Sequence, residues 1–143
     1  MARALTQDKM VKEILFKIQD HFFMIGSDLA LSGKNRSLLK GEISQNEVKW
    51  LNKLSTDFKA SLKLEPKFII YGETLISSVL DVARAVSRRA ERMMTKMRSR
   101  GMLSNPKVLE YLNCLSDVLY LLARYEEKKA KVRPKHPIYA LGP

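Results

Sequence analysis

Four stretches of this 143-residue chain place apolar side chains at spacings of three and four residues, which constrains the fold more than any other feature. Side chains at these spacings share one face of an α-helix, so each stretch predicts an amphipathic helix. We expect helices over residues 7–31, 44–62 and 73–100, and a fourth from 106 that frays through the charged run 126–131. Short connections then predict an all-α antiparallel bundle of four long helices. The bundle domain would be residues 1–131, and the proline-containing residues 132–143 a flexible or docked tail.

Several predicted helix ends carry capping residues. Ser44 and Glu47 have the spacing of a capping box, and Thr6 and Asn105 are expected as N-caps of the first and fourth helices. Gly101 is placed for a left-handed cap after the third helix. Residues 32–36 are expected to form a polar loop.

The same spacing predicts which side chains face the core. In the first helix these are Val11, Leu15, Ile18, Phe22, Ile25 and Leu29, with His21 at the edge of the stripe. In the third helix they are Leu75, Val79, Val82, Val86, Ala90, Met93 and Met97. In the fourth helix they are Val108, Leu112, Leu115, Leu119 and Leu122.

The composition limits which cellular compartment and which classes of partner we expect. The net charge of +11 favours an anionic partner, such as ATP or nucleic acid, or simply a solvated surface. The single cysteine, Cys114, excludes an internal disulfide and points to a reducing compartment, which we expect to be the cytoplasm. No apolar run approaches the roughly 20 residues of a membrane span, and with two histidines we expect no protein-bound metal site.

A row of arginines on the third predicted helix requires an explanation. Arg84, Arg88 and Arg92 are four residues apart, so like charges stack on one face. On the fourth helix a polar stripe runs beside the apolar seam, and its Asp117 is expected to pair with one of these arginines; the stripe consists of Asn113, Asp117, Tyr120 and Arg124. Both stripes could be solvated faces or interhelical salt bridges, a phosphate-ligand site, or a nucleic-acid surface, although that last reading rests on charge alone.

Four sequence blocks resemble the PduO-type ATP:cob(I)alamin (corrinoid) adenosyltransferase family. VARAVSRRAER (82–92) is similar to the signature helix of that family, and YLNCLSDVLYLLAR (111–124) to its second signature. IQDHFFMIGSDLA (18–30) and FIIYGE (68–73) resemble two further blocks, in the same order and with similar spacing.

The resemblance implies a homotrimeric helical bundle with active sites between subunits. Its ligands would be ATP with Mg²⁺ and cobalamin, and the reaction would transfer the 5′-deoxyadenosyl group of ATP to cob(I)alamin. Arg88 and Arg92 would be catalytic and bind ATP together with Arg89, Glu91 and Asn113. Phe68 would pack against the corrin, and Arg84 would form an ion pair beside it. The cobalt is itself the nucleophile, so the protein has to position the substrates and neutralise the triphosphate. Membrane and nucleic-acid partners are not expected.

The sequence also departs from the family pattern. The TGDxGxT and DELN blocks, which hold triphosphate and the usual partner of the arginine matched by Arg84, do not occur in these residues. Smaller departures are Tyr71 for Pro, Glu73 for Gly, Asn52 for Glu and Cys114 for Arg. Two interpretations therefore stand: an active adenosyltransferase, or a non-catalytic paralogue that serves as an ATP- or corrinoid-binding or scaffold bundle.

Overall fold

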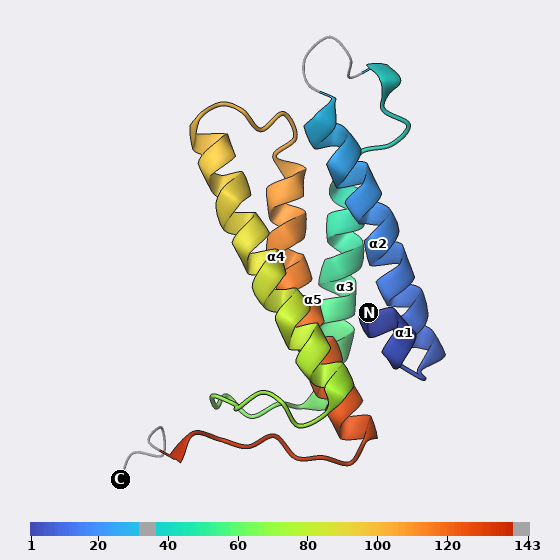
Figure 1. The fold of residues 1–143 in the computed structure, drawn as a ribbon, viewed down its shortest axis with the longest axis vertical. Coiled ribbons are helices and arrows are strands. Elements are labelled where there is room, and N and C mark those ends of the chain that lie inside the picture. The colour runs from blue at the N-terminus through green and yellow to red at the C-terminus, as the bar shows by residue number, and fades with distance from the viewer. Residues whose placement is uncertain (32–36, 139–143) are drawn as a thin grey trace.

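The apolar repeats fold into long antiparallel helices in the computed structural model, which describes residues 1–31 and 37–138 (Figure 1). The helices are α1 (Ala2–Leu5), α2 (Lys9–Ala30), α3 (Gln45–Leu62), α4 (Leu75–Ser99) and α5 (Lys107–Lys129). The all-α prediction of four long helices is confirmed, with α1 as an additional short turn. Within the described ranges, β-type pairing is limited to one isolated bridge between Ile70 and Lys135. The predicted loop at 32–36 lies outside the described residues.

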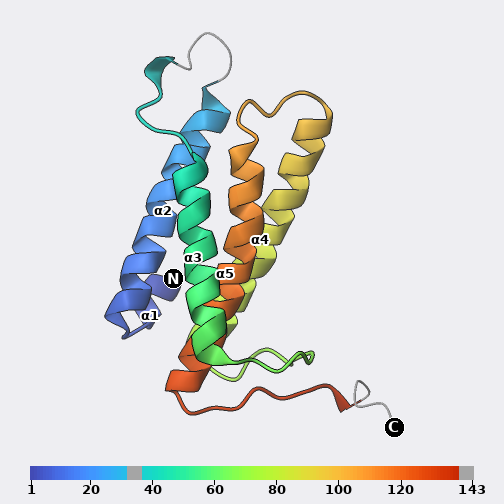
Figure 2. The ribbon, with the colours of Figure 1, turned by 180° about the vertical axis from the view of Figure 1, so that it is seen from behind.

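Helix α5 lies at the centre of the bundle. It packs between α3 and α4, as the view from behind also shows (Figure 2). Every side chain of its predicted seam is buried, namely Val108, Leu112, Leu115, Leu119 and Leu122. The prediction succeeded here because α5 has neighbours on several sides, so its apolar positions meet other helices.

The start of α2 corrects one predicted cap. Asp8, not Thr6, is the N-cap, and its carboxylate accepts a hydrogen bond from the Val11 amide at 3.1 Å. Thr6 is buried and its hydroxyl donates to the Glu126 carboxylate on α5. Asp8 also pairs with Lys129, whose hydrogen bond is the main reason that the pKa of Asp8 lies below its usual value. Thr6 and Asp8 thus connect the N-terminal end of α2 to the C-terminal end of α5.

The other predicted capping residues are found at their expected helix ends. The Ser44–Glu47 capping box is confirmed, with the Ser44 amide 2.8 Å from Glu47 Oε2. Gly101 has φ +67°, as a left-handed cap requires. The Asn105 side chain accepts from the Lys107 amide at 3.0 Å, although the helix begins one residue later than predicted.

Helix α4 turns a different face inward from the one predicted. Leu80, Ser77 and Ser87 are its buried residues. Four of the predicted seam residues are instead exposed: Leu75, Val82, Val86 and Met93. They fall on one side of the helix at spacings of seven, four and seven residues, and we call them the α4 apolar stripe. In α2, similarly, Phe22 is exposed and His21 is buried instead.

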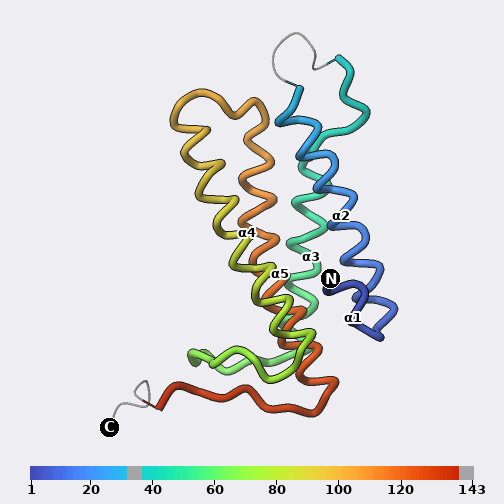
Figure 3. Tube along the Cα trace, viewed as in Figure 1, coloured from blue at the N-terminus to red at the C-terminus, as the bar shows by residue number. Residues whose placement is uncertain are grey.

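The connector between α3 and α4 and the residues after α5 meet at one end of the bundle (Figure 3). Helix α5 ends in a Schellman motif, in which the Val132 amide donates to the Glu127 carbonyl at 3.0 Å and Lys131 takes φ +57°. The chain then runs beside the connector, and the Ile70 amide donates to the Lys135 carbonyl at 2.8 Å. The division into a bundle at 1–131 and a flexible tail at 132–143 stays a prediction. None of the helices in the described ranges is long and apolar enough to cross a membrane.

Candidate functional site

The predicted arginine row lines a cavity on the outer side of α4. Arg84, Arg88 and Arg92 lie one helical turn apart and border a volume of about 630 Å³ together with Tyr71 and Asp81. Three guanidinium groups on one wall make this cavity strongly cationic. Guanidinium groups bind phosphate oxygens through paired hydrogen bonds, so the cavity is chemically suited to a polyphosphate.

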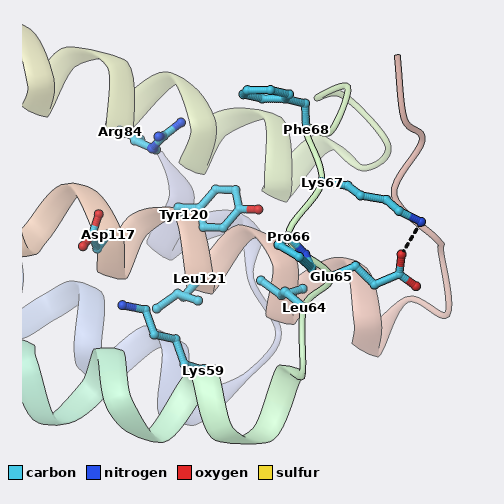
Figure 4. A pocket seen from close by; sticks show the side chains of 10 residues that line it. All are labelled: Lys59, Leu64, Glu65, Pro66, Lys67, Phe68, Arg84, Asp117, Tyr120 and Leu121. Carbon is cyan, nitrogen blue, oxygen red and sulfur yellow. Dashed lines mark ion pairs between the residues drawn. The ribbon is translucent and has the colours of Figure 1, made fainter. Parts of the chain in front are cut away.

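A second cavity, which we call the Phe68 cavity, lies beside the connector that precedes α4 (Figure 4). Its volume is about 510 Å³, and it is bordered by Phe68, Tyr120, Asp117, Lys59 and Arg84, with residues 64–67 forming one wall. Phe68 projects into solvent with 80% of its surface exposed. An exposed aromatic ring at the mouth of a cavity supplies a flat apolar surface for a ligand.

Arg84 separates the two cavities and contributes to both. Its Nη1 donates to the Tyr71 hydroxyl at 2.9 Å, and its guanidinium carbon lies 5.3 Å from the centre of the Tyr120 ring. Its Nε is buried and has no hydrogen-bond partner in the described part of the chain. A ligand in either cavity would therefore meet the same arginine.

The expected pairing of Asp117 with an arginine of α4 is wrong. The ion pair between α4 and α5 joins Asp81 to Arg124, with Oδ2 and Nη2 2.8 Å apart. Arg124 Nη2 also lies 2.8 Å from Glu127 Oε1. Asp117 is exposed and lines the Phe68 cavity instead.

Burial determines the electrostatics between the cavities. It raises the pKa of Asp81 even though Arg124 acts in the opposite direction. Burial likewise raises the pKa of the Tyr120 hydroxyl, which keeps it protonated and able to donate a hydrogen bond at neutral pH. Asp81 in the wall of the first cavity and Tyr120 in the wall of the second thus both lie against the buried Arg124.

The remaining predicted ATP residues are distributed around the row. Glu91 pairs with Arg88, with 3.3 Å between Oε2 and Nη1. Arg89 is exposed and is not among the residues that border the two cavities. Asn113 is exposed on α5, and the antiparallel register fixed by Arg84 against Tyr120 places it level with Glu91 and Arg92. The structure therefore places Arg88 and Arg92 in one cavity and Phe68 in the other, with Arg84 in both, while Arg89 and Asn113 border neither.

Sequence reasoning missed two residues that shape the site. Tyr71 stood out only as a departure from the family pattern, and Asp81 was not singled out. Both contact residues that are distant in sequence, namely Arg84 and Arg124. The polar stripe of α5 was the available signal, since Arg124 continues the spacing of Asp117 and Tyr120.

Comparison with known proteins gives a consistent result. The model of the cobalamin adenosyltransferase family matches residues 1–126. A corrinoid adenosyltransferase of Citrobacter freundii is 32% identical over 124 residues, which are 87% of this chain and 70% of that protein. A corrinoid adenosyltransferase of Mycobacterium leprae is 30% identical over 126 residues, and this chain spans 64% of its length.

Solved structures show the same likeness in three dimensions. A variant PduO-type ATP:corrinoid adenosyltransferase from Lactobacillus reuteri, complexed with cobalamin and ATP, superposes with a TM-score of 0.82 at 28% identity. The match covers 96% of this chain and 76% of that one. Together with the family match over most of the sequence, these similarities show that the chain belongs to the cobalamin adenosyltransferase family.

Proposed function

We propose that this protein is a corrinoid adenosyltransferase that moves the 5′-deoxyadenosyl group of ATP to cob(I)alamin. The observation that carries the proposal is the position of Arg84 in the walls of both the arginine-lined cavity and the Phe68 cavity. Transfer between two substrates requires them to be adjacent, and this shared wall would make them so. The similarity to an adenosyltransferase whose structure was solved in complex with cobalamin and ATP supports the same assignment.

The reaction is a displacement at the 5′-carbon of ATP. The cobalt(I) electron pair forms the bond to that carbon, the bond from carbon to oxygen breaks, and triphosphate leaves as the cobalt becomes formally cobalt(III). Arg88 and Arg92 would neutralise charge on the departing triphosphate, with Arg89, Glu91 and Asn113 contributing at the edge of the ATP site. Phe68 would pack on the corrin and exclude water from its lower face, and Arg84 would position the substrates against each other.

Mg²⁺ would enter with ATP. Within residues 1–31 and 37–138, no three His, Cys, Asp or Glu side chains form a cluster able to hold a metal ion. The phosphates would therefore supply most of the oxygen ligands, and Glu91, beside Arg88, is the carboxylate of the row available to add one.

The test is an anaerobic assay of reduced cobalamin with Mg-ATP and the protein. We expect the light-sensitive spectrum of adenosylcobalamin to appear. Arg88→Ala should lower the rate by about 100-fold to 1,000-fold, as loss of one transition-state donor does. Arg98→Ala is the matched control, because Arg98 is exposed near the end of α4 and outside both cavities. Binding of both substrates without turnover would favour the alternative of a non-catalytic binding protein, and an Arg88 variant with full activity would overturn the site assignment.

We further propose that the protein is a homotrimer and works in the cytoplasm. The α4 apolar stripe supports self-association, since Leu75, Val82 and Met93 are each about 60–70% exposed on one side of a helix. Sedimentation should give three times the chain mass of 16.4 kDa. Val82→Glu should dissociate the trimer, whereas Thr95→Glu on the opposite side of the same helix should not. A monomeric parent protein would contradict the proposal.

A further inference from the structure

A third group of cations lies at the end of the bundle, between the connector and the residues that follow α5. Two adjoining cavities of about 310 and 430 Å³ share Leu64, Pro134, Arg124 and Arg133 as walls. Their other lining residues include Lys63, Lys128, Lys131 and His136, against the single carboxylate of Glu65. Neither the arginine row on α4 nor Phe68 belongs to this group, which we call the basal cavity.

Arg124 provides the interior wall of the basal cavity. Only 1% of its side chain is exposed, and Nη2 donates to Asp81 and Glu127. Its Nη1 and Nε have no hydrogen-bond partner within the described ranges. Buried guanidinium donors without acceptors are costly, so an oxyanion that reached them would be stabilised.

The attraction for an anion comes from the surrounding cations. Asp81 and Glu127 already offset the charge of Arg124. In contrast, no carboxylate among the described residues forms an ion pair with Lys63, Lys131 or Arg133. Arg133 lines both parts of the basal cavity, Lys63 one part and Lys131 the other. A phosphate group beside Arg133 would therefore meet a second cation in either part, and charge-assisted bonds to phosphate are among the stronger hydrogen bonds.

The basal cavity shares part of its wall with the Phe68 cavity. Both cavities are lined by Leu64, Glu65 and Tyr120. A substituent of a ligand bound on Phe68 could therefore pass these residues and reach the basal cavity. The chain after α5 is held in place to form the outer wall, because His136 Nδ1 lies 2.7 Å from the Phe68 carbonyl oxygen and Lys135 pairs with Glu73.

We propose that the basal cavity binds the phosphodiester of the corrinoid nucleotide loop. This inference rests on the proposed function, which places the corrin ring on Phe68. Arg133 would contact the phosphate from the outer wall, and Arg124 Nη1 would face it from the interior. The site would thus distinguish a complete corrinoid, which carries a nucleotide loop, from cobinamide, which lacks it.

Equilibrium dialysis with cobalamin and cobinamide, both in the presence of Mg-ATP, tests this assignment. Wild-type protein should bind cobalamin more tightly than cobinamide. Arg133→Gln should weaken cobalamin binding by roughly threefold to tenfold and leave cobinamide binding unchanged, as loss of one partly solvated ionic contact predicts. Arg133 is exposed, so this exchange should leave the fold intact, and Arg98→Gln is the control for loss of one surface charge.

The outcomes separate this inference from the proposed function. Equal binding of the two corrinoids by the wild type, or equal weakening of both by Arg133→Gln, would overturn the phosphodiester site while adenosylation of cobinamide still supported the transferase. If neither corrinoid binds and no adenosylation occurs, the proposed function and the phosphodiester site both fail.

Discussion

Replacing Arg124 with methionine should strongly destabilise the protein. The guanidinium is 1% exposed and lies 2.8 Å from both Asp81 and Glu127, whose side chains are 7% and 2% exposed. The variant would keep two buried carboxylates and remove the cation between them. Breaking a buried pair in this way costs about 3–5 kcal/mol, a large part of the roughly 5–15 kcal/mol that stabilises a typical domain.

The loss of stability in Arg124→Met should depend on pH, and the environment of Asp81 in the wild type determines the direction of that dependence. Burial already raises the pKa of Asp81, and without Arg124 the attraction that opposes this shift disappears. A carboxyl group whose folded pKa is raised destabilises the fold increasingly as pH rises from its unfolded value through its folded value. The Arg124→Met variant should therefore lose most stability at pH 8 and recover part of it at pH 5, where the buried Asp81 carboxyl group is protonated more readily.

Urea unfolding followed by far-ultraviolet circular dichroism, at one protein concentration and at both pH values, measures the effect. Arg98→Met is the matched control, because Arg98 is exposed on the same helix as Asp81. A variant within about 1 kcal/mol of the wild type at pH 8 would show that the buried pair contributes far less than the expected range. A loss of the same size at both pH values would refute the assignment of the cost to ionised carboxylates.

Two further perturbations act on the other side of the bundle. Asp8→Ala removes the N-cap of α2 and the acceptor for Lys129, so the free energy of unfolding should fall by about 1–2 kcal/mol, whereas Asp8→Asn should recover part of that loss in the same urea titration. Burial lowers the pKa of His21, so the unfolded chain binds a proton more readily and stability should decrease as pH falls below about 6.5. Thermal unfolding between pH 5.5 and 7.5 should show this slope in the wild type and a shallower one in His21→Phe, and an unchanged slope would contradict the assignment.

The fold was predictable where local pattern and tertiary contact agree. Helix α5 is enclosed by its neighbours, and its apolar seam is therefore its buried face. The capping box at Ser44 was equally predictable, because every atom that it uses lies within four residues.

Helix α4 shows why the pattern failed elsewhere. Its strongest apolar face, with Val82 and Val86, points outward, and a face containing Ser77 and Ser87 packs inward. Periodicity identifies a face that avoids water but does not identify the surface that covers it. His21 was misjudged for a related reason, since its buried Nδ1 lies 3.0 Å from the hydroxyl of Tyr111, a partner distant in sequence.

The arginines of the candidate site were predictable from the sequence, but the residues that contact them were not. The spacing of Arg84, Arg88 and Arg92 placed them on one face without any structure. Their neighbours required long-range contacts, because Tyr71 reaches Arg84 across a loop and Asp81 reaches Arg124 between two helices. Asp117 was a reasonable partner by spacing alone, but it lies on the exposed side of α5.

The departures of the connector from the family pattern have a common structural role. Tyr71, where the family has proline, gives its hydroxyl to Arg84 as an acceptor at 2.9 Å. Glu73 stands where the family has glycine, and its Oε1 lies 3.5 Å from Lys135 Nζ. This ion pair helps to hold the chain after α5 beside Phe68. Neither side chain could be shortened to the usual residue without losing its contact. These two departures therefore connect residues 63–74 to α4 on one side and to the outer wall of the basal cavity on the other.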